Sequence, residues 1–202
     1  MRGRGKAALL IVAAILVAHL LDSFFYNYVT YDDIYNRDWG RALRVLGFLP
    51  LWLAAALALW LHDRPVRGGA RAQLLTAAVI VSGIAGELLK LVFRRERPGA
   101  HEGHYFFRSF LERPFSSSGL ALPSSHAIVA FGAAAMLARL FPRARLVFWG
   151  AAWGCALSRV AAGAHFFSDV VVAACAAWLV SWLLWRSFAL RERDHAQDTG
   201  GK

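Results

Sequence analysis

The sequence predicts an all-α integral membrane bundle of six transmembrane helices, and two observations support this fold class. First, 58% of the 202 residues are hydrophobic and only 18% are charged, whereas soluble domains are usually about 45–50% apolar. Second, the apolar residues fall into six segments, each near the roughly 20 residues that a helix needs to cross a bilayer. The polar stretches between them are too short to be domains, so we expect residues 1–202 to form one domain.

The expected spans follow one another along the chain with short connections. They are residues 7–26, 44–62, 71–93, 121–141, 145–162 and 166–188. The first span follows a basic start, as the apolar part of a signal peptide would, but no small-residue cleavage site appears near Ser23. We therefore interpret it as an uncleaved span. Cys155 and Cys175 lie inside apolar runs, which is typical of core residues rather than of a disulfide pair.

The chain is strongly basic, with 23 Lys and Arg against 13 Asp and Glu and a formal net charge of +10. A membrane surface and an anionic substrate explain this charge better than nucleic acid, so we expect no nucleic-acid partner. With a cytoplasmic N-terminus, the inner segments 1–6, 62–71, 139–145 and 186–202 hold three, three, three and four of the basic residues. Because cytoplasmic loops are enriched in Lys and Arg, we expect the motifs to face the periplasm or exterior. The composition is rich in Arg and Ala, from which we expect a bacterial protein of the inner membrane.

The first motif, residues 90–98, ends the third expected span. Lys90 lies in an apolar run, where a charge needs a partner or a water-filled cavity, although a lone lysine at a helix end often snorkels to the interface. From their spacing we expect Lys90, Arg94 and Arg97 on one helical face, with the following proline ending the helix. We expect Glu87, one turn before Lys90, to form an ion pair with it.

The second motif, residues 123–126, reads Pro-Ser-Ser-His and precedes the fourth expected span. Serine at a helix start is usually an N-cap, and this role alone would explain either Ser124 or Ser125. His126 adds a group that can exchange protons in the first turn, where free N–H groups and the helix dipole favour a bound phosphate. Alone, this pattern is a weak signal.

The third motif, residues 158–169, joins the fifth and sixth expected spans. On a helix, His165 and Asp169 would share a face, so the carboxylate could hold one ring nitrogen protonated and leave a lone pair on the other. Such a pair makes an imidazole a nucleophile or base, and a structural His–Asp hydrogen bond explains it equally well. Arg159 adds a permanent cation suited to bidentate phosphate contacts.

The three motifs in this order, Lys-x6-Arg-Pro, Pro-Ser-Ser-His and Ser-Arg-x5-His-x3-Asp, resemble those of the type-2 phosphatidic acid phosphatase family. The resemblance covers about residues 85–170 and extends to the whole chain through the number of spans. It implies that His165 forms a phosphohistidine, that Asp169 orients it, and that His126 protonates the leaving alkoxide and then activates water. The residues implied to bind the phosphoryl oxygens are Lys90, Arg97, Ser124, Ser125 and Arg159.

The resemblance also implies a reaction that needs no metal and no cofactor. Phosphoryl transfer spreads negative charge over three equatorial oxygens, which two arginines, a lysine and a helix N-terminus can stabilise. We interpret Asp32, Asp33 and Asp38 in the first loop as solvated residues rather than as a metal cage. The chain departs from the family at Ser125, where glycine is common. A backbone N–H contact to phosphate survives this change.

The implied partner is a phosphorylated membrane lipid at the outer leaflet. Candidates are phosphatidylglycerophosphate, phosphatidic acid, undecaprenyl diphosphate and the phosphates of lipid A. The aromatic-rich residues 99–115 include Arg108 and Arg113, and we expect these side chains in the headgroup layer. We therefore interpret this stretch as an interfacial lid that helps to choose the lipid. Two alternatives stay open: a lipid phosphotransferase on the same scaffold, and a non-enzymatic transporter or sensor with a proton relay through His165, Asp169 and Glu87. The oligomeric state stays open as well.

Overall fold

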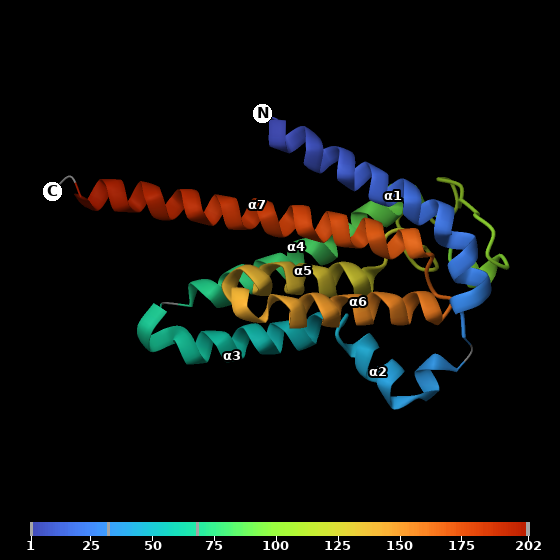
Figure 1. Cartoon of the computed structure of the whole chain (residues 1–202), viewed down its shortest axis with the longest axis horizontal. Helices are drawn as coiled ribbons and strands as arrows, with labels where there is room; N and C mark the ends of the chain where they lie inside the picture. The colour runs from blue at the N-terminus through green and yellow to red at the C-terminus, as the bar shows by residue number, and fades with distance from the viewer. Residues whose placement is uncertain (1, 32, 68, 201–202) are drawn as a thin grey trace.

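The computed structural model describes residues 2–31, 33–67 and 69–200, and the regular elements within these ranges are all helices (Figure 1). The α-helices are α1 (Arg2–Val29), α2 (Asp38–Val45), α3 (Leu49–Arg67), α4 (Ala70–Phe93), α5 (Ser125–Leu140), α6 (Arg145–Ala161) and α7 (Phe167–Gly200). The short 3-10 helices η1 (Ile34–Asn36), η2 (Pro98–Ala100) and η3 (Pro142–Ala144) lie in the connections. The predicted all-α membrane bundle is confirmed.

Among the described residues, three helices are long and apolar enough to cross a bilayer, namely Gly5–Val29, Ala70–Phe93 and Phe167–Ala189. Helix α2 and the first part of α3 qualify together as a fourth span, bent by 62°. The predicted count of six spans is not confirmed, because α5 has only 16 residues and α6 only 17. At 1.5 Å per residue such a helix is about 24 Å long, against a hydrocarbon core of about 30 Å.

Two predicted spans begin too early. The segment 44–62 starts in α2 and crosses the bend at residues 46–48, and the segment 121–141 starts before α5, which begins at Ser125. Apolar side chains occupy both the bend and the stretch before α5. Hydropathy therefore does not separate these stretches from the helices that follow them.

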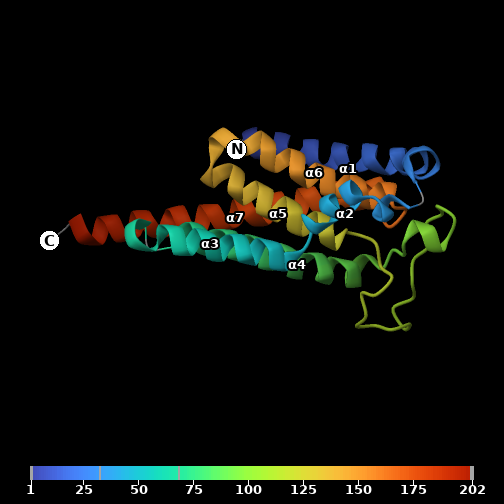
Figure 2. The ribbon, with the colours of Figure 1, turned by 90° about the horizontal axis from the view of Figure 1, so that it is seen from below.

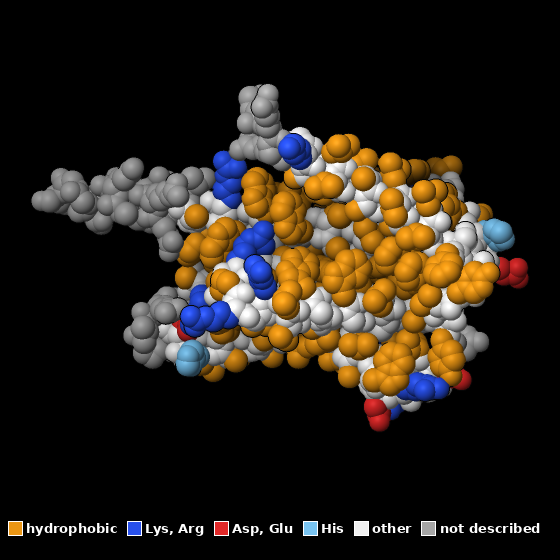
Figure 3. Space-filling model, viewed as in Figure 1, with side chains coloured by type: hydrophobic (Ala, Val, Ile, Leu, Met, Phe, Trp, Pro, Cys, Tyr) orange, Lys and Arg blue, Asp and Glu red, His pale blue; other side chains and the backbone are white. Residues whose placement is uncertain are grey.

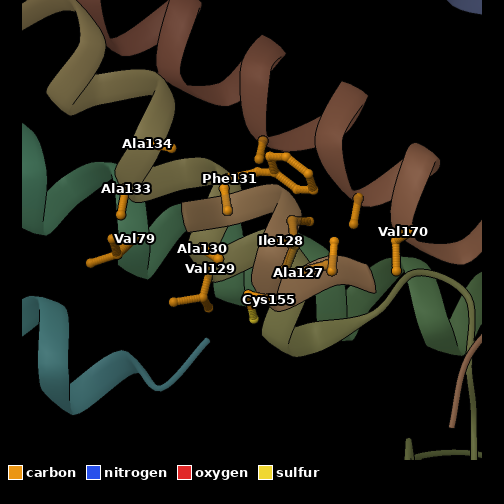
Figure 4. Packing of buried hydrophobic residues seen from close by; sticks show 14 of the residues in the cluster. Val79, Ala127, Ile128, Val129, Ala130, Phe131, Ala133, Ala134, Cys155 and Val170 are labelled. Atoms are coloured by element: carbon orange, nitrogen blue, oxygen red, sulfur yellow. The ribbon is translucent and has the colours of Figure 1, made fainter. Parts of the chain in front are cut away.

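Helix α5 lies at the centre of the bundle and packs against α4, α6 and α7. All residues from 127 to 137 are buried, and Figure 4 shows side chains of α5 beside Val79 of α4 and Val170 of α7. Most of these residues are small, which lets the helices approach closely. At Gly132 a Cβ atom would lie 2.7 Å from Oγ of Ser82, so the α4–α5 contact requires glycine. This packing fixes the N-terminal end of α5.

The three motifs lie at one end of the bundle. Residues 90–98 follow the end of α4, residues 123–126 begin α5, and residues 158–169 pass from α6 into α7. Figures 1 and 2 show the α3–α4 and α5–α6 turns at the opposite end, toward which α7 also runs. The antiparallel path of the helices therefore brings distant segments of the sequence into one region.

The surface of the bundle is largely apolar. Figure 3 shows hydrophobic side chains over the middle of one face, and most of its Lys and Arg side chains toward the end with the α3–α4 and α5–α6 turns. Leu20, Leu146 and Val147 are strongly exposed, which suits side chains that contact lipid. The basic segments 1–6, 62–71 and 186–202 lie partly outside the described residues.

Candidate active site

His165 is buried in the connection between α6 and α7. Its Nδ1 atom lies 3.0 Å from the backbone carbonyl oxygen of Ala121 and 3.6 Å from Oδ2 of Asp169. Because a carbonyl oxygen only accepts hydrogen bonds, this contact assigns the ring proton to Nδ1. The other ring nitrogen, Nε2, then carries the lone pair.

The expectation that His165 and Asp169 share a helical face is wrong. Helix α7 begins at Phe167, so His165 precedes the helix and Asp169 lies in its first turn. The two side chains still meet because Asp169 Oδ2 accepts a hydrogen bond of 2.7 Å from the backbone N–H of Phe166. An acid at this position commonly reaches back to the first free N–H of its helix. Capping of α7 therefore brings the carboxylate beside the imidazole.

The surroundings of His165 keep its ring uncharged. The pKa of His165 is lowered to about 4, mainly by burial and in addition by the positive charges of Arg159 and Arg97. The hydrogen bond and the negative charge of Asp169 act in the opposite direction. The imidazole is therefore neutral at neutral pH, with a free lone pair for attack on an electrophile.

Arg95 holds Asp169 from the other side, a role that the sequence analysis did not assign. Its Nη2 donates to Asp169 Oδ1 and, over 2.8 Å, to the hydroxyl of Ser168. Its guanidinium lies over the rings of Tyr105 and Phe166 at 5.0 and 4.9 Å. The signal that points to this role is the charge of Arg95, because a buried arginine needs a buried anion.

Asp22 of α1 ties the first helix to the same network. Its carboxylate accepts hydrogen bonds from the backbone N–H of Ser168 at 2.7 Å and from the hydroxyls of Ser168 and Tyr105 at 2.5 and 2.6 Å. Burial and the bond to Asp22 raise the pKa of the Tyr105 phenol, which stays a donor. Asp22 also lies 3.9 Å from Arg95. A chain of buried groups therefore runs from α1 to His165.

The first motif does not form one helical face, so that expectation is wrong. Helix α4 ends at Phe93, and Arg94 adopts a left-handed conformation with φ 54° that turns the chain. Arg94 is buried and donates to the backbone carbonyls of Arg108, Ser109, Glu112 and Pro114. Arg97 lies beyond the helix in extended backbone, and its charge acts on both His165 and Arg159. Arg94 therefore fixes the loop of residues 108–114, whereas Arg97 contributes its positive charge to the surroundings of His165.

Lys90, Glu87 and Ser125 form a polar cluster between α4 and α5. The predicted ion pair is confirmed, because Lys90 Nζ lies 3.1 Å from Glu87 Oε1. The Ser125 hydroxyl accepts from Lys90 and donates to Glu87 Oε1 over 2.7 Å. Ser117 donates to the other carboxylate oxygen of Glu87 over 2.5 Å. The hydroxyl that replaces the family's usual glycine thus connects the first two motifs.

Ser124 is the N-cap of α5, as the capping interpretation expects. Its Oγ accepts a hydrogen bond of 3.5 Å from the backbone N–H of Ala127. Its own N–H donates to the backbone oxygen of Asp169 over 3.3 Å, which joins the starts of α5 and α7. His126 follows in the first turn, within electrostatic reach of Arg159 and His165. The second and third motifs therefore meet at these two helix starts.

Arg159 approaches the site from α6 and contacts a tyrosine that the sequence analysis did not single out. Its Nη1 donates to the hydroxyl of Tyr35 over 2.6 Å, and its guanidinium lies 5.4 Å from the centre of the Tyr35 ring. Arg44 of α2 lies over the same ring at 5.0 Å. The Nε atoms of both arginines are buried without a hydrogen-bond partner. The sequence analysis did not identify Tyr35 or Arg44, because both residues lie far from the three motifs in the sequence.

A cavity of about 580 Å³, which we call the lateral groove, opens beside the site between α4, α5 and the α2–α3 bend. Its polar end is formed by Arg44, Glu87, Ser125 and His126. Its apolar walls are formed by Gly47, Phe48, Leu49, Ile80, Gly83, Ile84, Leu88, Leu91 and Val129. Two wall residues, Ile84 and Leu88, are more than half exposed on the surface of the bundle. The groove therefore connects His126 with the lipid-facing surface.

The loop between η2 and α5 exposes an aromatic surface. Phe106, Phe107, Phe110, Leu111 and Phe115 are exposed. Arg108, which we expected in the headgroup layer, is instead buried and bonded to Glu96 at 2.6 Å. A hydrogen bond from His101 lowers the pKa of Glu96, with further help from Arg108. Within the described residues, no group of three or more His, Cys, Asp and Glu side chains is arranged to hold a metal ion.

Comparisons with known proteins place the chain in a family. Two curated proteins named Lipid A 1-phosphatase are similar to the chain: one from Rhizobium etli is 37% identical over 99 residues, and one from Rhizobium johnstonii is 39% identical over 103. The matches cover 48% and 50% of this chain but only 41% of each relative's length. No solved structure matches the chain significantly. The model of the PAP2 superfamily matches residues 71–193, which include all three motifs, and the chain therefore belongs to this superfamily.

Proposed function

We propose that this chain is a membrane lipid phosphatase that hydrolyses a phosphomonoester or diphosphate through a phosphohistidine at His165. The observation that carries the proposal is the buried imidazole of His165, whose Nδ1 lies 3.0 Å from the carbonyl oxygen of Ala121, so that Nε2 carries the lone pair. The charges of Arg97 and Arg159 act on this ring. Phosphohistidine formation needs a lone pair on the ring and positive charge around the phosphoryl oxygens. Membership of the PAP2 superfamily supports this enzymatic proposal over a proton relay.

In the proposed first step, Nε2 of His165 attacks the phosphorus atom and the bond from phosphorus to the leaving oxygen breaks. The proton on Nδ1 stays bonded to the carbonyl of Ala121, and Asp169 stabilises the positive charge that develops on the ring. His126, in the imidazolium form that binding of the anionic phosphate favours, gives its proton to the leaving oxygen and becomes neutral. A phosphomonoester lipid then departs as an alcohol, and a lipid diphosphate departs as a lipid monophosphate.

In the proposed second step, water attacks the phosphorus atom of the phosphohistidine. His126, now neutral, accepts a proton from this water. The phosphorus–nitrogen bond breaks and its electron pair returns to Nε2, which releases inorganic phosphate. Lys90, Arg97 and Arg159 stabilise the charge on the equatorial oxygens. Ser125 would bind a phosphoryl oxygen through its backbone N–H at the start of α5, because its hydroxyl already bonds Lys90 and Glu87. The N–H and the hydroxyl of Ser124 already bond Asp169 and Ala127, so Ser124 would hold this helix start in place beside the phosphate.

The lateral groove and the aromatic loop support a lipid as the substrate. The groove leads from His126, the proposed acid for the leaving group, to the apolar surface, so a lipid chain can stay in the bilayer while its phosphate reacts. The loop that carries Phe110 and Phe115 supports the proposed interfacial lid, because exposed aromatic residues suit the headgroup layer. Both relatives are named Lipid A 1-phosphatase, which supports a phosphorylated membrane lipid as the substrate.

The proposed location is the bacterial inner membrane, with the site facing the periplasm. The distribution of basic residues supports this orientation, because most Lys and Arg on the face in Figure 3 gather at the end away from the motifs. The site would then act on lipid phosphates of the outer leaflet. No nucleic acid takes part in this proposal, and the oligomeric state is not specified by it.

The proposal is tested with purified protein in detergent and four lipids: phosphatidylglycerophosphate, phosphatidic acid, undecaprenyl diphosphate and lipid A. We expect release of free phosphate from at least one lipid and undiminished release after treatment with EDTA. The matched control is His104→Ala, which removes an exposed histidine of the loop and should retain activity. Phosphate found on an acceptor lipid instead of in solution would indicate a phosphotransferase. Loss of activity with EDTA that Mg²⁺ restores would contradict the metal-independent mechanism.

A further inference from the structure

We infer that Arg44 of α2 binds a second negative charge on the leaving-group side of the substrate. The preferred substrate is then a lipid whose leaving group is itself anionic, and a lipid diphosphate is the simplest example. This inference rests on the proposed function and names the substrate class of the same site. It depends on three observations: the missing partner of Arg44, its contact with Tyr35, and its place in the lateral groove.

Arg44 is a cation without a compensating anion among the described residues. It lines the polar end of the lateral groove, and its buried Nε has no hydrogen-bond partner. Glu87, the carboxylate in the same lining, is already engaged at both oxygens by Lys90, Ser125 and Ser117. An uncompensated charge beside apolar walls is costly. An anion supplied by the substrate would remove this cost.

Tyr35 holds Arg44 near the reactive site. The guanidinium carbons of Arg44 and Arg159 lie 5.0 and 5.4 Å from the centre of the Tyr35 ring. The Tyr35 hydroxyl donates to the backbone oxygen of Ser158 over 3.2 Å, which fixes the ring to α6. Two guanidinium groups on one ring repel each other, and their repulsion falls when anions bind beside them. The arrangement therefore suits a substrate with two neighbouring negative groups.

The lateral groove separates the tasks of the two arginines. Arg159 contributes to the surroundings of His165 and does not line the groove, whereas Arg44 lines it together with His126. Because His126 is the proposed acid for the leaving group, Arg44 lies on the side to which the leaving group departs. In a lipid diphosphate the second phosphate occupies this side. A phosphomonoester with a neutral leaving group leaves Arg44 unpaired.

The experiment compares a polyprenyl diphosphate with the polyprenyl monophosphate of the same chain length. For Arg44→Gln we expect kcat/KM to fall about 10- to 100-fold with the diphosphate, the value of one lost charge-assisted contact, and to change less than about threefold with the monophosphate. Arg44→Lys keeps the charge and should recover part of the diphosphate activity. The matched control is Arg41→Gln, which removes an exposed cation of the same helix and should affect neither substrate.

A second substrate pair identifies the kind of anion. Phosphatidylglycerophosphate carries a phosphodiester in its leaving group, and phosphatidic acid with the same acyl chains does not. A selective loss of Arg44→Gln on the first of these lipids extends the assignment to phosphodiesters, and a loss confined to the diphosphate restricts it to a directly attached phosphate. Equal losses on monophosphate and diphosphate would contradict the inference while leaving the phosphatase activity intact. Absence of phosphate release by the wild type would contradict the proposed function itself.

If Arg44→Gln does not fold, inhibition of the wild type and of Arg44→Lys provides the test. Inorganic diphosphate should inhibit the wild type about tenfold more strongly than inorganic phosphate, because it can reach both arginines. This preference should be smaller in Arg44→Lys, since lysine lacks the planar fork of arginine. Equal inhibition of the wild type by both anions would overturn the assignment.

Discussion

His165 and His126 occupy different surroundings, and we expect different results when each is replaced. His165→Ala should abolish turnover and leave no phosphohistidine, because no other group in the motifs is held as this ring is by Ala121 and Asp169. His126→Ala should lose far more activity on a lipid phosphomonoester than on an activated aryl phosphate, since a positioned acid contributes about 10²–10⁴-fold when the leaving group is poor. Measurement of kcat/KM for both substrates checks this difference.

Trapping of the intermediate separates the two roles. Wild-type protein quenched during turnover should carry phosphate that is labile in acid and stable in alkali, and His165→Ala should carry none. Phosphate retained on His165→Ala would contradict the nucleophile assignment. Equal losses on both substrates in His126→Ala would contradict the assignment of the general acid. Size-exclusion profiles that match the wild type show that each variant is folded.

The pKa of His165 predicts a dependence of stability on pH. Burial lowers this pKa from the ordinary 6.5 to about 4, so between these values the unfolded chain binds a proton that the folded chain excludes. Stability is therefore lost as the pH falls from 6.5 to 4, by up to about 3 kcal/mol for this group. The variant His165→Gln should not show this loss of stability, because glutamine does not bind a proton in this pH range. The thermal midpoint of the wild type relative to His165→Gln should fall across this window, and a constant difference would contradict the assignment.

At the scale of single residues, the sequence predicts contacts between residues that are close together in the chain. It does not predict the distant residues that hold the motif side chains in place. The spacing of Lys90 and Glu87 was sufficient to predict their ion pair, because i, i+3 geometry is local. Arg95 and Asp22, which lie 73 residues apart in the sequence, form an ion pair. Arg44 and Arg159, which lie 115 residues apart, both contact the ring of Tyr35, a residue outside the three motifs. Such contacts depend on how the helices pack, which no local spacing encodes.

Among the helices, the bend between α2 and α3 is placed by a glycine. A Cβ atom on Gly47 would lie 2.5 Å from Cβ and 2.8 Å from Cα of His126. We expect Gly47→Ala to push the bend away from α5, to lower stability by about 1–3 kcal/mol and to reduce activity. Gly150→Ala in α6 is the matched control, because nothing lies within 4 Å of its Cβ. Thermal midpoints and phosphate release of both variants check the prediction, and equal behaviour would contradict it.

The attachment of α1 to the other helices depends on Asp22. Its carboxylate accepts three hydrogen bonds from Ser168 and Tyr105, and Asp22→Asn replaces one acceptor oxygen with a donor. We expect a loss of about 3–5 kcal/mol, the range for breaking a buried charged network, and a lower rate through displacement of Arg95. Asp38→Asn removes an exposed carboxylate and should change stability by less than about 1 kcal/mol. Similar thermal midpoints for the two variants would show that Asp22 is not a structural anchor.

For the whole molecule, hydropathy predicted the fold class and the approximate positions of six helices. It did not predict the bend at residues 46–48 or the late start of α5, because apolar side chains also line bends and connections that are buried by their neighbours. Charge was equally ambiguous. Arg94 and Arg108 were counted with the site and the headgroup layer, yet both are buried and bond to the loop that they hold. The prediction that the three motifs follow one another at the same end of the helices agrees with their positions in the bundle.

The orientation of the bundle gives the last prediction, which single cysteines can measure. In a background with Cys155 and Cys175 replaced by alanine, we place one cysteine at Leu111 in the aromatic loop and another at Pro142 in the α5–α6 turn; both positions are exposed. These positions lie at opposite ends of the bundle, and Arg139, Arg143 and Arg145 surround the second. Because basic loops stay in the cytoplasm, a membrane-impermeant maleimide should label only the first in spheroplasts and both after permeabilisation. Labelling of only the second in spheroplasts would mean that the site faces the cytoplasm.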